Sequence, residues 1–359
     1  MVQNWVNVAC IVTSITDTQQ TLRSRELRDS LHHTLTLTVV NFAGTVAVVS
    51  GLGIAFFALP PTTGFLLGVI VGSTSPAVIV PLVRQLRFAN GARTVLILES
   101  AVSDVLSIVA TIAFLETLHR GGFHLGVVTG AILASFTLAT AIGAATAFLW
   151  SVLLNRLRTL QNSIFTTPAF VFVVFGVVEL LGYSGYIAAL AFGVTLGNIE
   201  RFNLPFLRRF IPEEPIALNE TERSFFSEVV FLLKTFFFVY VGISIRLNDI
   251  FPVATGLALS AAILLWRIPA VRFTMRKGLN KRDAGLMAAI SPKGLAAAAL
   301  ASLPLQQGIV NGELIQNVAY AVVLFSIVLT SVLIFLQHAT GLSKVYQFVF
   351  RGLPDKEDS

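Results

Sequence analysis

Long apolar runs, separated by short polar connections, occupy most of this sequence. A helix needs about twenty consecutive apolar residues to cross the hydrocarbon core of a bilayer. Ten segments approach or exceed that length: 34–59, 62–86, 93–118, 124–154, 164–182, 183–199, 223–245, 249–274, 283–303 and 312–337. Because a spanning backbone must satisfy its hydrogen bonds within the protein, the pattern predicts an all-α polytopic membrane protein with about ten transmembrane segments.

Two of these segments, 62–86 and 283–303, are interrupted by polar residues and a proline. Proline has no N–H to donate and disfavours helix in the residue before it. The residues expected to break the helices are Pro76 in the first segment, and Pro292 with Gly294 in the second. One broken helix in each half is typical of transporters built from inverted repeats. The alternative is that each proline only kinks its helix.

The composition supports a membrane protein. The chain is 55% hydrophobic and 12% charged, with a mean hydropathy of +0.80, whereas soluble domains carry roughly 25% charged residues. The net charge of +6 does not indicate nucleic-acid binding, because the basic residues lie in short loops between apolar segments. The single Cys10 excludes a disulfide framework and a cysteine-based metal site. No Walker motif and no GxGxxG sequence supports nucleotide coupling, and no cofactor is expected.

Basic loop residues predict the orientation of the segments in the membrane. Nearly all lysines and arginines fall in alternate loops, and the loops on the other side contain only Arg120 and Arg246. The positive-inside rule then places the C-terminus in the cytoplasm and the protein in the plasma (cell inner) membrane. We expect three parts: a truncated N-terminal segment and cytoplasmic connection at 1–33, a transmembrane exchanger domain at 34–337, and a short cytoplasmic tail at 338–359.

Segment 93–118 contains two carboxylates, Glu99 and Asp104, at membrane depth. A charged side chain there costs from about 3 kcal/mol upward, so such residues are usually functional. The two positions are about 140° apart around a helix, which predicts separate roles. Hydroxyl groups lie close to both of them along the helix: Ser100, Ser103 and Ser107. Asp104, with Ser100 and Ser107 on its face, is the candidate site for a small cation or a proton.

Glu99 needs a cationic partner, and Arg267 is the best buried candidate. Arginine stays charged at any depth and can bind a carboxylate through two hydrogen bonds. We expect a structural ion pair. Lys293, beside the second break, is expected to balance the negative half-helix ends there. The alternative for Lys293 is a side chain that reaches out to the membrane interface.

Five motifs in order resemble those of NhaP-type sodium or potassium/proton antiporters, members of the monovalent cation/proton antiporter superfamily. The motifs are GSTSPAVIVPLVRQL (72–86), LILESAVSD (96–104), GYSGYIAALAFGVTLGN (182–198), SEVVFLLKTFFFVYVGISI (227–245) and SPKGLAAAALA (291–301). The resemblance covers roughly 34 to 337. It implies the inverted-repeat antiporter fold with two crossing discontinuous helices, 62–86 and 283–303, and a homodimer. It also implies that helices preceding position 34, the first two or three of the family, are lacking.

The resemblance also assigns roles to residues. Asp104 is implied to be the ion and proton site, with Thr74, Ser100 and Ser103 helping to coordinate the ion. Ser75, which we include in the site, stands where the family has an aspartate. Ser103 stands where it has an asparagine, next to Asp104. A single aspartate in that pair suggests one proton per monovalent cation, and therefore electroneutral exchange.

We therefore expect a secondary active transporter, not an enzyme, which exchanges Na⁺ or K⁺ for protons by competition at Asp104. No metal is expected beyond the transported ion, and the lipid bilayer is the other partner. Two alternatives remain at this stage. One is a related ion-coupled solute transporter. The other is a non-transporting membrane scaffold or sensor, or a truncated inactive fragment.

Overall fold

A computed structural model describes the main part of the chain. The described residues are 24–86, 88–119, 125–157, 166–183, 185–197, 238–246, 248–275 and 279–339, with shorter stretches of one to four residues within 228–236 and 346–353. The regular elements in these ranges are helices, apart from one isolated bridge between Arg351 and Leu353. The chain divides into two compact units, 1–22 with 116–236 and 23–115 with 237–359, which we describe separately.

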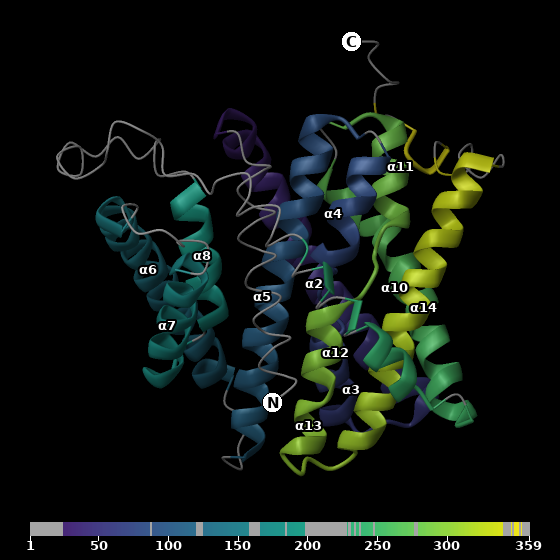
Figure 1. Cartoon of the computed structure of the whole chain (residues 1–359). Coiled ribbons are helices and arrows are strands. Elements are labelled where there is room, and N and C mark those ends of the chain that lie inside the picture. Colours follow the sequence, from purple (N-terminus) through teal and green to yellow (C-terminus); the bar gives the residue numbers. More distant parts are fainter. Residues whose placement is uncertain are drawn as a thin grey trace. The chain divides into compact units, whose positions relative to one another are not determined.

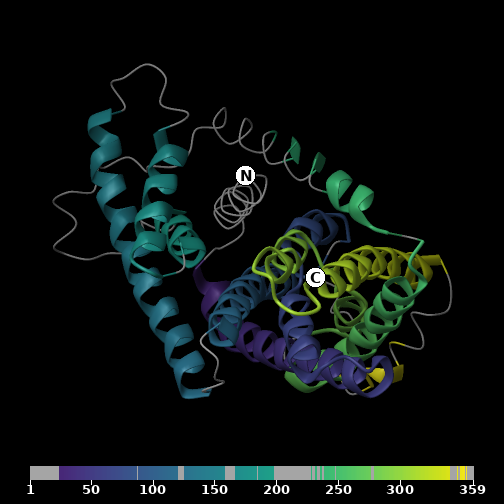
Figure 2. The same cartoon turned by 90° about the horizontal axis from the view of Figure 1, so that it is seen from below.

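The second unit contains the two interrupted helices (Figure 1). Its helices are α2 (Ser24–Phe57), α3 (Pro61–Ile70), α4 (Pro76–Gln85), most of α5 (Asn90–His119), α10 (Ile250–Thr274), α11 (Lys281–Ala289), α12 (Leu295–Ala301), α13 (Leu303–Gln306) and α14 (Gly312–Ala339). Helix α10 packs against α14 and α2, and α2 packs against α3. Seen along the helices in Figure 2, α14 (yellow) lies beside α10 (green). The predicted segments 62–86 and 283–303 are thus helix–break–helix units, α3–α4 and α11–α12.

One end of this unit is filled by a large apolar cluster. It contains Leu37 of α2, Ile79 of α4, Leu96 of α5, Val271 of α10 and Met287 of α11, all fully or almost fully buried. Phe350, near the end of the chain, is 1% exposed and belongs to the same cluster. Helices that carry the two breaks are therefore held at that end by side chains from most of the other helices.

The first unit contains α6 (Leu125–Leu157), α7 (Thr166–Leu180) and α8 (Gly185–Gly197). Its core joins Trp150 of α6, Val171 of α7 and Phe192 of α8. The indole ring of Trp150 stacks on Phe170 with 4.3 Å between ring centroids, and its Nε1 donates to Thr167 Oγ1 at 3.2 Å. Aromatic packing of this kind suits a bundle in which hydrophobic burial alone gives little preference among helix partners.

Element positions agree well with the apolar pattern. Five described helices are long and apolar enough to cross a membrane by length and composition: 33–57, 91–115, 136–153, 250–274 and 312–339. Shorter apolar helices cover 61–70, 169–180 and 295–306. Part of the predicted span 223–245 lies outside the described residues, so the total of ten stays a prediction.

The first predicted helix begins earlier than its apolar pattern. We expected it from position 34, whereas α2 begins at Ser24. The residues in between include arginine, leucine and glutamate, which have high helix propensity. Hydropathy predicts only the apolar part of a helix, the part inside the membrane. A polar extension of the same helix beyond the membrane is therefore not predicted from hydropathy. Residues 1–23 lie outside the described part, and the predicted division of the chain at 33 and 337 stays a prediction.

A glycine contact between α6 and α8 gives a test of this packing. A Cβ atom on Gly143 would lie 2.1 Å from the carbonyl oxygen of Ala188, whereas a Cβ on Gly130 of the same helix would meet nothing. We expect Gly143→Ala to destabilise the protein by about 1–3 kcal/mol through overpacking. Gly130→Ala should be neutral or slightly stabilising, because alanine is the better helix former. Thermal unfolding of both variants in detergent measures this, and equal melting temperatures would contradict the contact.

Candidate functional site

The two helix breaks meet in the interior of the second unit. The backbone N–H of Ser75, at the end of the first break, donates to the carbonyl of Pro292 in the second break at 2.8 Å. A Cβ atom built on Gly294 would lie only 2.0 Å from Ser75 Oγ, so the second break needs a glycine at this point. The second break therefore supplies both a hydrogen-bond acceptor, the carbonyl of Pro292, and the space at Gly294 that Ser75 of the first break needs. A backbone group left unpaired at membrane depth would cost several kcal/mol.

Local sequence explains where each half-helix begins. Pro76 is the first residue of α4, a position that needs no N–H donor, and Ser75 before it is extended with φ −74° and ψ 114°. Gly294 is the N-cap of α12 with φ −153° and ψ −140°. Neither cap makes a side-chain hydrogen bond. The N-terminal N–H groups of α4 and α12 are thus at the crossing, where helix dipoles favour negative charge.

Hydroxyl groups of α5 hold the first break in place. Ser103 Oγ accepts from the backbone N–H of Thr74 at 3.1 Å and donates to Ser100 O of its own helix. Ser107 Oγ donates to Val69 O at 2.7 Å, near the end of α3. Ser100 Oγ donates to Ile97 O at 2.8 Å. These serines, expected as ion ligands or as neighbours of the ion, serve here as connections within α5 or between α5 and the broken helix.

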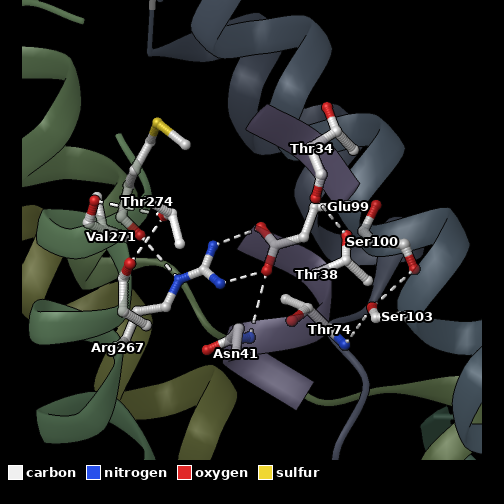
Figure 3. A network of polar contacts seen from close by, with 12 residues as sticks. Thr34, Thr38, Asn41, Thr74, Glu99, Ser100, Ser103, Arg267, Val271 and Thr274 are labelled. Carbon is white, nitrogen blue, oxygen red and sulfur yellow. Dashed lines mark hydrogen bonds and ion pairs between the residues drawn. The ribbon is translucent and has the colours of Figure 1, made fainter. Parts of the chain in front are cut away.

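A buried ion pair joins α5 to α10, as the sequence predicted. Both guanidinium NH₂ groups of Arg267 donate to Glu99, Nη1 to Oε1 and Nη2 to Oε2, the latter at 2.6 Å (Figure 3). Arg267 Nε also donates to Met287 O of α11 at 3.3 Å. Both side chains are 0% exposed. Bidentate geometry with further hydrogen bonds is the arrangement in which a buried pair can offset the loss of hydration.

Asn41 of α2 completes this arrangement. Its Nδ2 donates to Glu99 Oε1 at 3.2 Å, as Figure 3 shows. Glu99 is thereby bound by side chains from α2 and α10, in addition to its own helix α5. We did not predict this role for Asn41. The available signal was an amide within the apolar run 34–59, a position where polar residues usually have a partner.

Several polar atoms at the crossing have no hydrogen-bond partner in the described part of the chain. Those from the two breaks are Thr74 Oγ1, Ser75 Oγ, Ser291 Oγ and Lys293 Nζ. All four residues are buried, and Lys293 is 0% exposed. This full burial argues against a side chain that reaches the membrane interface. The backbone N–H of Lys293 donates to Ser326 Oγ of α14 at 2.9 Å, another contact that we did not predict.

Asp104 lies on α5 and is partly exposed, in contrast to Glu99. One residue from each break interacts with its carboxylate. The side chain of Ser73 forms a hydrogen bond to it, and the positive charge of Lys293 attracts it. Lys293 is in turn acted on by the charges of Arg267, Glu99 and Asp104. The predicted ion-pair residues, break residues and Asp104 are therefore brought together in one region, and Ser73 is added to them.

Comparison with known proteins places this chain in a family. A family model described as the transmembrane part of the sodium/hydrogen exchanger matches residues 21–336. The chain belongs to the sodium/hydrogen exchanger family. This assignment agrees with the resemblance seen in the five motifs.

Two curated relatives of this exchanger-family chain are the K⁺/H⁺ antiporters NhaP2 of Shewanella sp. strain ANA-3 and of Shewanella oneidensis. Each is 22% identical over 311 residues, which make up 85% of this chain and 52% of the relative. The chain thus spans about half the length of the curated relatives that it matches.

The fold is that of a solved antiporter. The sodium proton antiporter MjNhaP1 from Methanocaldococcus jannaschii, in its structure at pH 8, superposes with a TM-score of 0.71 at 18% identity. The match covers 92% of this exchanger-family chain and 86% of that chain. An electron-microscopy map of the same antiporter gives a TM-score of 0.67 at 17% identity. The predicted all-α antiporter fold is therefore confirmed.

The ion pair makes a prediction about folding. Glu99→Ala and Arg267→Ala should each lower the yield of folded protein, because removing one partner leaves a buried charge at a cost of about 3–5 kcal/mol. The double variant Glu99→Leu/Arg267→Met should recover most of the loss. Size-exclusion profiles of the solubilised protein give the folded fraction.

The chain offers a matched control at an exposed ion pair. Arg246 Nη1 lies 2.6 Å from Glu313 Oε1, with side chains 68% and 56% exposed. Arg246→Ala should change stability by at most about 1 kcal/mol. If Glu99→Ala and Arg267→Ala purify as well as this control but lose transport, the pair is not primarily structural.

Proposed function

We propose that this chain exchanges a monovalent cation, Na⁺ or K⁺, for protons across a membrane, with Asp104 binding each in turn. One observation carries the proposal: the carboxylate of Asp104 interacts with one residue from each helix break. Ser73 of the first break forms a hydrogen bond to it, and the charge of Lys293 of the second break attracts it. Glu99, the other carboxylate in the middle of α5, is fully engaged by Arg267 and Asn41. Binding and release of an ion at Glu99 would break the pair that holds the helices together.

The mechanism is competition for one carboxylate. A proton or a cation neutralises Asp104. With either one bound, the site can switch between opening to one side of the membrane and to the other, whereas the empty, charged site switches poorly. This restriction alone couples the two fluxes. Three hydroxyls at the crossing, those of Thr74, Ser75 and Ser291, have no hydrogen-bond partner among the described residues. They are oxygen ligands of the kind that hard cations prefer. Ser100 and Ser103 are further candidate ligands, although their hydroxyls bind backbone groups in this structure.

The lone carboxylate supports electroneutral exchange. Serine stands at 103 and at 75, where the resembling family has asparagine and aspartate, so Asp104 is the one acidic side chain at these three positions. One proton then exchanges for one monovalent cation. Relatives named as K⁺/H⁺ antiporters and a structural neighbour named as a sodium proton antiporter support either ion.

Lys293 complements this arrangement. Its ammonium group is fully buried beside the breaks and lies within the field of Asp104, Glu99 and Arg267. We propose that it balances the negative ends of the half-helices and the charge of the empty Asp104 site. A homodimer in the plasma membrane, with the C-terminus in the cytoplasm, completes the proposal, on the basis of the resemblance and of the basic residues in alternate loops.

Substitution of the site aspartate tests the function directly. Asp104→Asn keeps the shape of the side chain but removes its titrating group, so cation-driven proton flux should be abolished while the protein still folds. Dequenching of a pH-sensitive dye in proteoliposomes, titrated with Na⁺ and K⁺, measures the flux. Glu313→Gln, which removes an exposed carboxylate, should keep wild-type exchange. Cation-driven flux that persists in Asp104→Asn would refute the proposal.

Competition also predicts the sign of the pH dependence. Protonation of Asp104 excludes the cation, so the apparent KM for Na⁺ or K⁺ should rise as pH falls, by up to about tenfold per pH unit, at unchanged maximal rate. An imposed membrane potential should leave the rate unchanged, because one positive charge moves in each direction. Initial rates in the same vesicles at several pH values provide the measurement. If lowering the pH reduces the maximal rate while KM stays constant, proton and cation do not share a site.

A further inference from the structure

A cavity at one end of the second unit lies outside the exchange site. It has a volume of about 270 Å³ and is lined by Lys281, Arg282, Gly285, Leu286, Gln337, His338 and Tyr346. These residues come from the first half of the second broken helix, α11, from the end of α14, and from the C-terminal segment. The beginning of α11 and the end of α14 lie at the same end of the unit (Figure 1).

The lining of this cavity is basic and rich in hydrogen-bond donors. Lys281 and Arg282 carry positive charge, and His338, Gln337 and Tyr346 add an imidazole, an amide and a phenol. No carboxylate belongs to the lining among the described residues. The nearest acid in the sequence is Asp283, which is not part of the lining. Its Oδ2 accepts from the backbone N–H of Ala89 at 3.1 Å, and its own N–H donates to Asn280 Oδ1.

The polar groups of the cavity wall are held in position by the protein. Gln337 is 8% exposed, and its Nε2 donates to Gly285 O at 3.2 Å. Tyr346 packs on α11, since a Cβ on Gly285 would lie 3.2 Å from the Tyr346 Cβ. Burial raises the pKa of Tyr346, so its phenol keeps its proton at neutral pH and remains a possible donor. Lys281 and Arg282 stand in the first turn of α11, where the helix dipole adds positive potential.

We propose that this cavity binds a phosphate group. Arginine and lysine side chains with nearby N–H and O–H donors are the usual partners of phosphate oxygens. The volume lies just below the roughly 300–1,000 Å³ of drug-sized ligand pockets, so it suits a headgroup or a small ion better than a large ligand. The alternate-loop pattern of basic residues predicts that this end faces the cytoplasm, where a free phosphate or an anionic lipid headgroup can reach it.

Such a ligand would act on the second broken helix. It would contact α11, which runs directly into the break at Pro292 and Lys293, and would join α11 to the end of α14. The inference does not depend on exchange at Asp104. Asp104→Asn should therefore bind phosphate as well as the wild type does, which separates a failure of this proposal from a failure of the transport proposal.

Thermal unfolding of the detergent-solubilised chain tests the site with two probes. One is inorganic phosphate compared with chloride at equal ionic strength, and the other is phosphatidylglycerol compared with phosphatidylcholine in mixed micelles. We expect at least one probe to raise the melting temperature of the wild type by about 2–4 °C. A shift with inorganic phosphate indicates a soluble phosphate ligand. A shift with phosphatidylglycerol alone indicates a lipid headgroup.

Variants decide whether the shift comes from this cavity. Lys281→Gln/Arg282→Gln should lose the stabilisation, whereas Arg84→Gln/Arg351→Gln, which removes the same charge from exposed positions outside the cavity lining, should keep it. The comparison is needed because phosphate also stabilises proteins by exclusion from their surface. An unchanged melting temperature with both probes would overturn the proposal. So would an equal shift in the cavity variant and in its control.

Discussion

The hydrogen bond from Ser75 N–H to the Pro292 carbonyl is the interaction on which the rest of the second unit depends. A bilayer offers no water to backbone groups that leave a helix, so a broken helix is stable only where the protein supplies partners. Here the second break supplies a carbonyl to the first, and serine hydroxyls of α5 bind the N–H of Thr74 and the carbonyl of Val69. Two interruptions that would each be costly alone are compatible with a membrane because they cross.

The Glu99–Arg267 pair stabilises buried charge in a similar way, because each side chain neutralises the other inside the protein. Its bidentate contact, together with Asn41 from α2 and Met287 O from α11, ties four helices around one carboxylate. Five residues further along α5, Asp104 has surroundings of a different kind: partial exposure, one serine side chain and the field of Lys293. The contrast agrees with the proposed division of roles, in which the partners of Glu99 hold helices together and Asp104 exchanges its partner. Similar chemical groups on one helix thereby support different roles.

The prediction of elements succeeded where hydropathy and backbone chemistry agree. Proline next to polar residues located both breaks, at 76 and 292, because proline lacks the N–H of a helical hydrogen bond and its polar neighbours can leave the helix. Proline alone was not enough, since Pro81 and Pro269 lie inside α4 and α10. The pairing of Glu99 with Arg267 also followed from the sequence, since few buried charges were available to satisfy one another. Less was foreseen of neutral partners. Asn41, Ser73 and Ser326 are single polar residues in apolar runs, and such residues bind to many possible groups.

The sequence by itself determined the class of the protein, the position of the breaks and the residues able to hold charge, because each of these depends on local composition and on the solvent properties of the bilayer. Only the tertiary structure decided that the two breaks touch, that α5 hydroxyls bind backbone rather than stand free, and that Lys293 is enclosed. It also brought Lys281, Gln337 and Tyr346 around one cavity. These contacts join residues far apart in the chain, and their geometry follows from how helices pack, which spacing along a single helix does not specify.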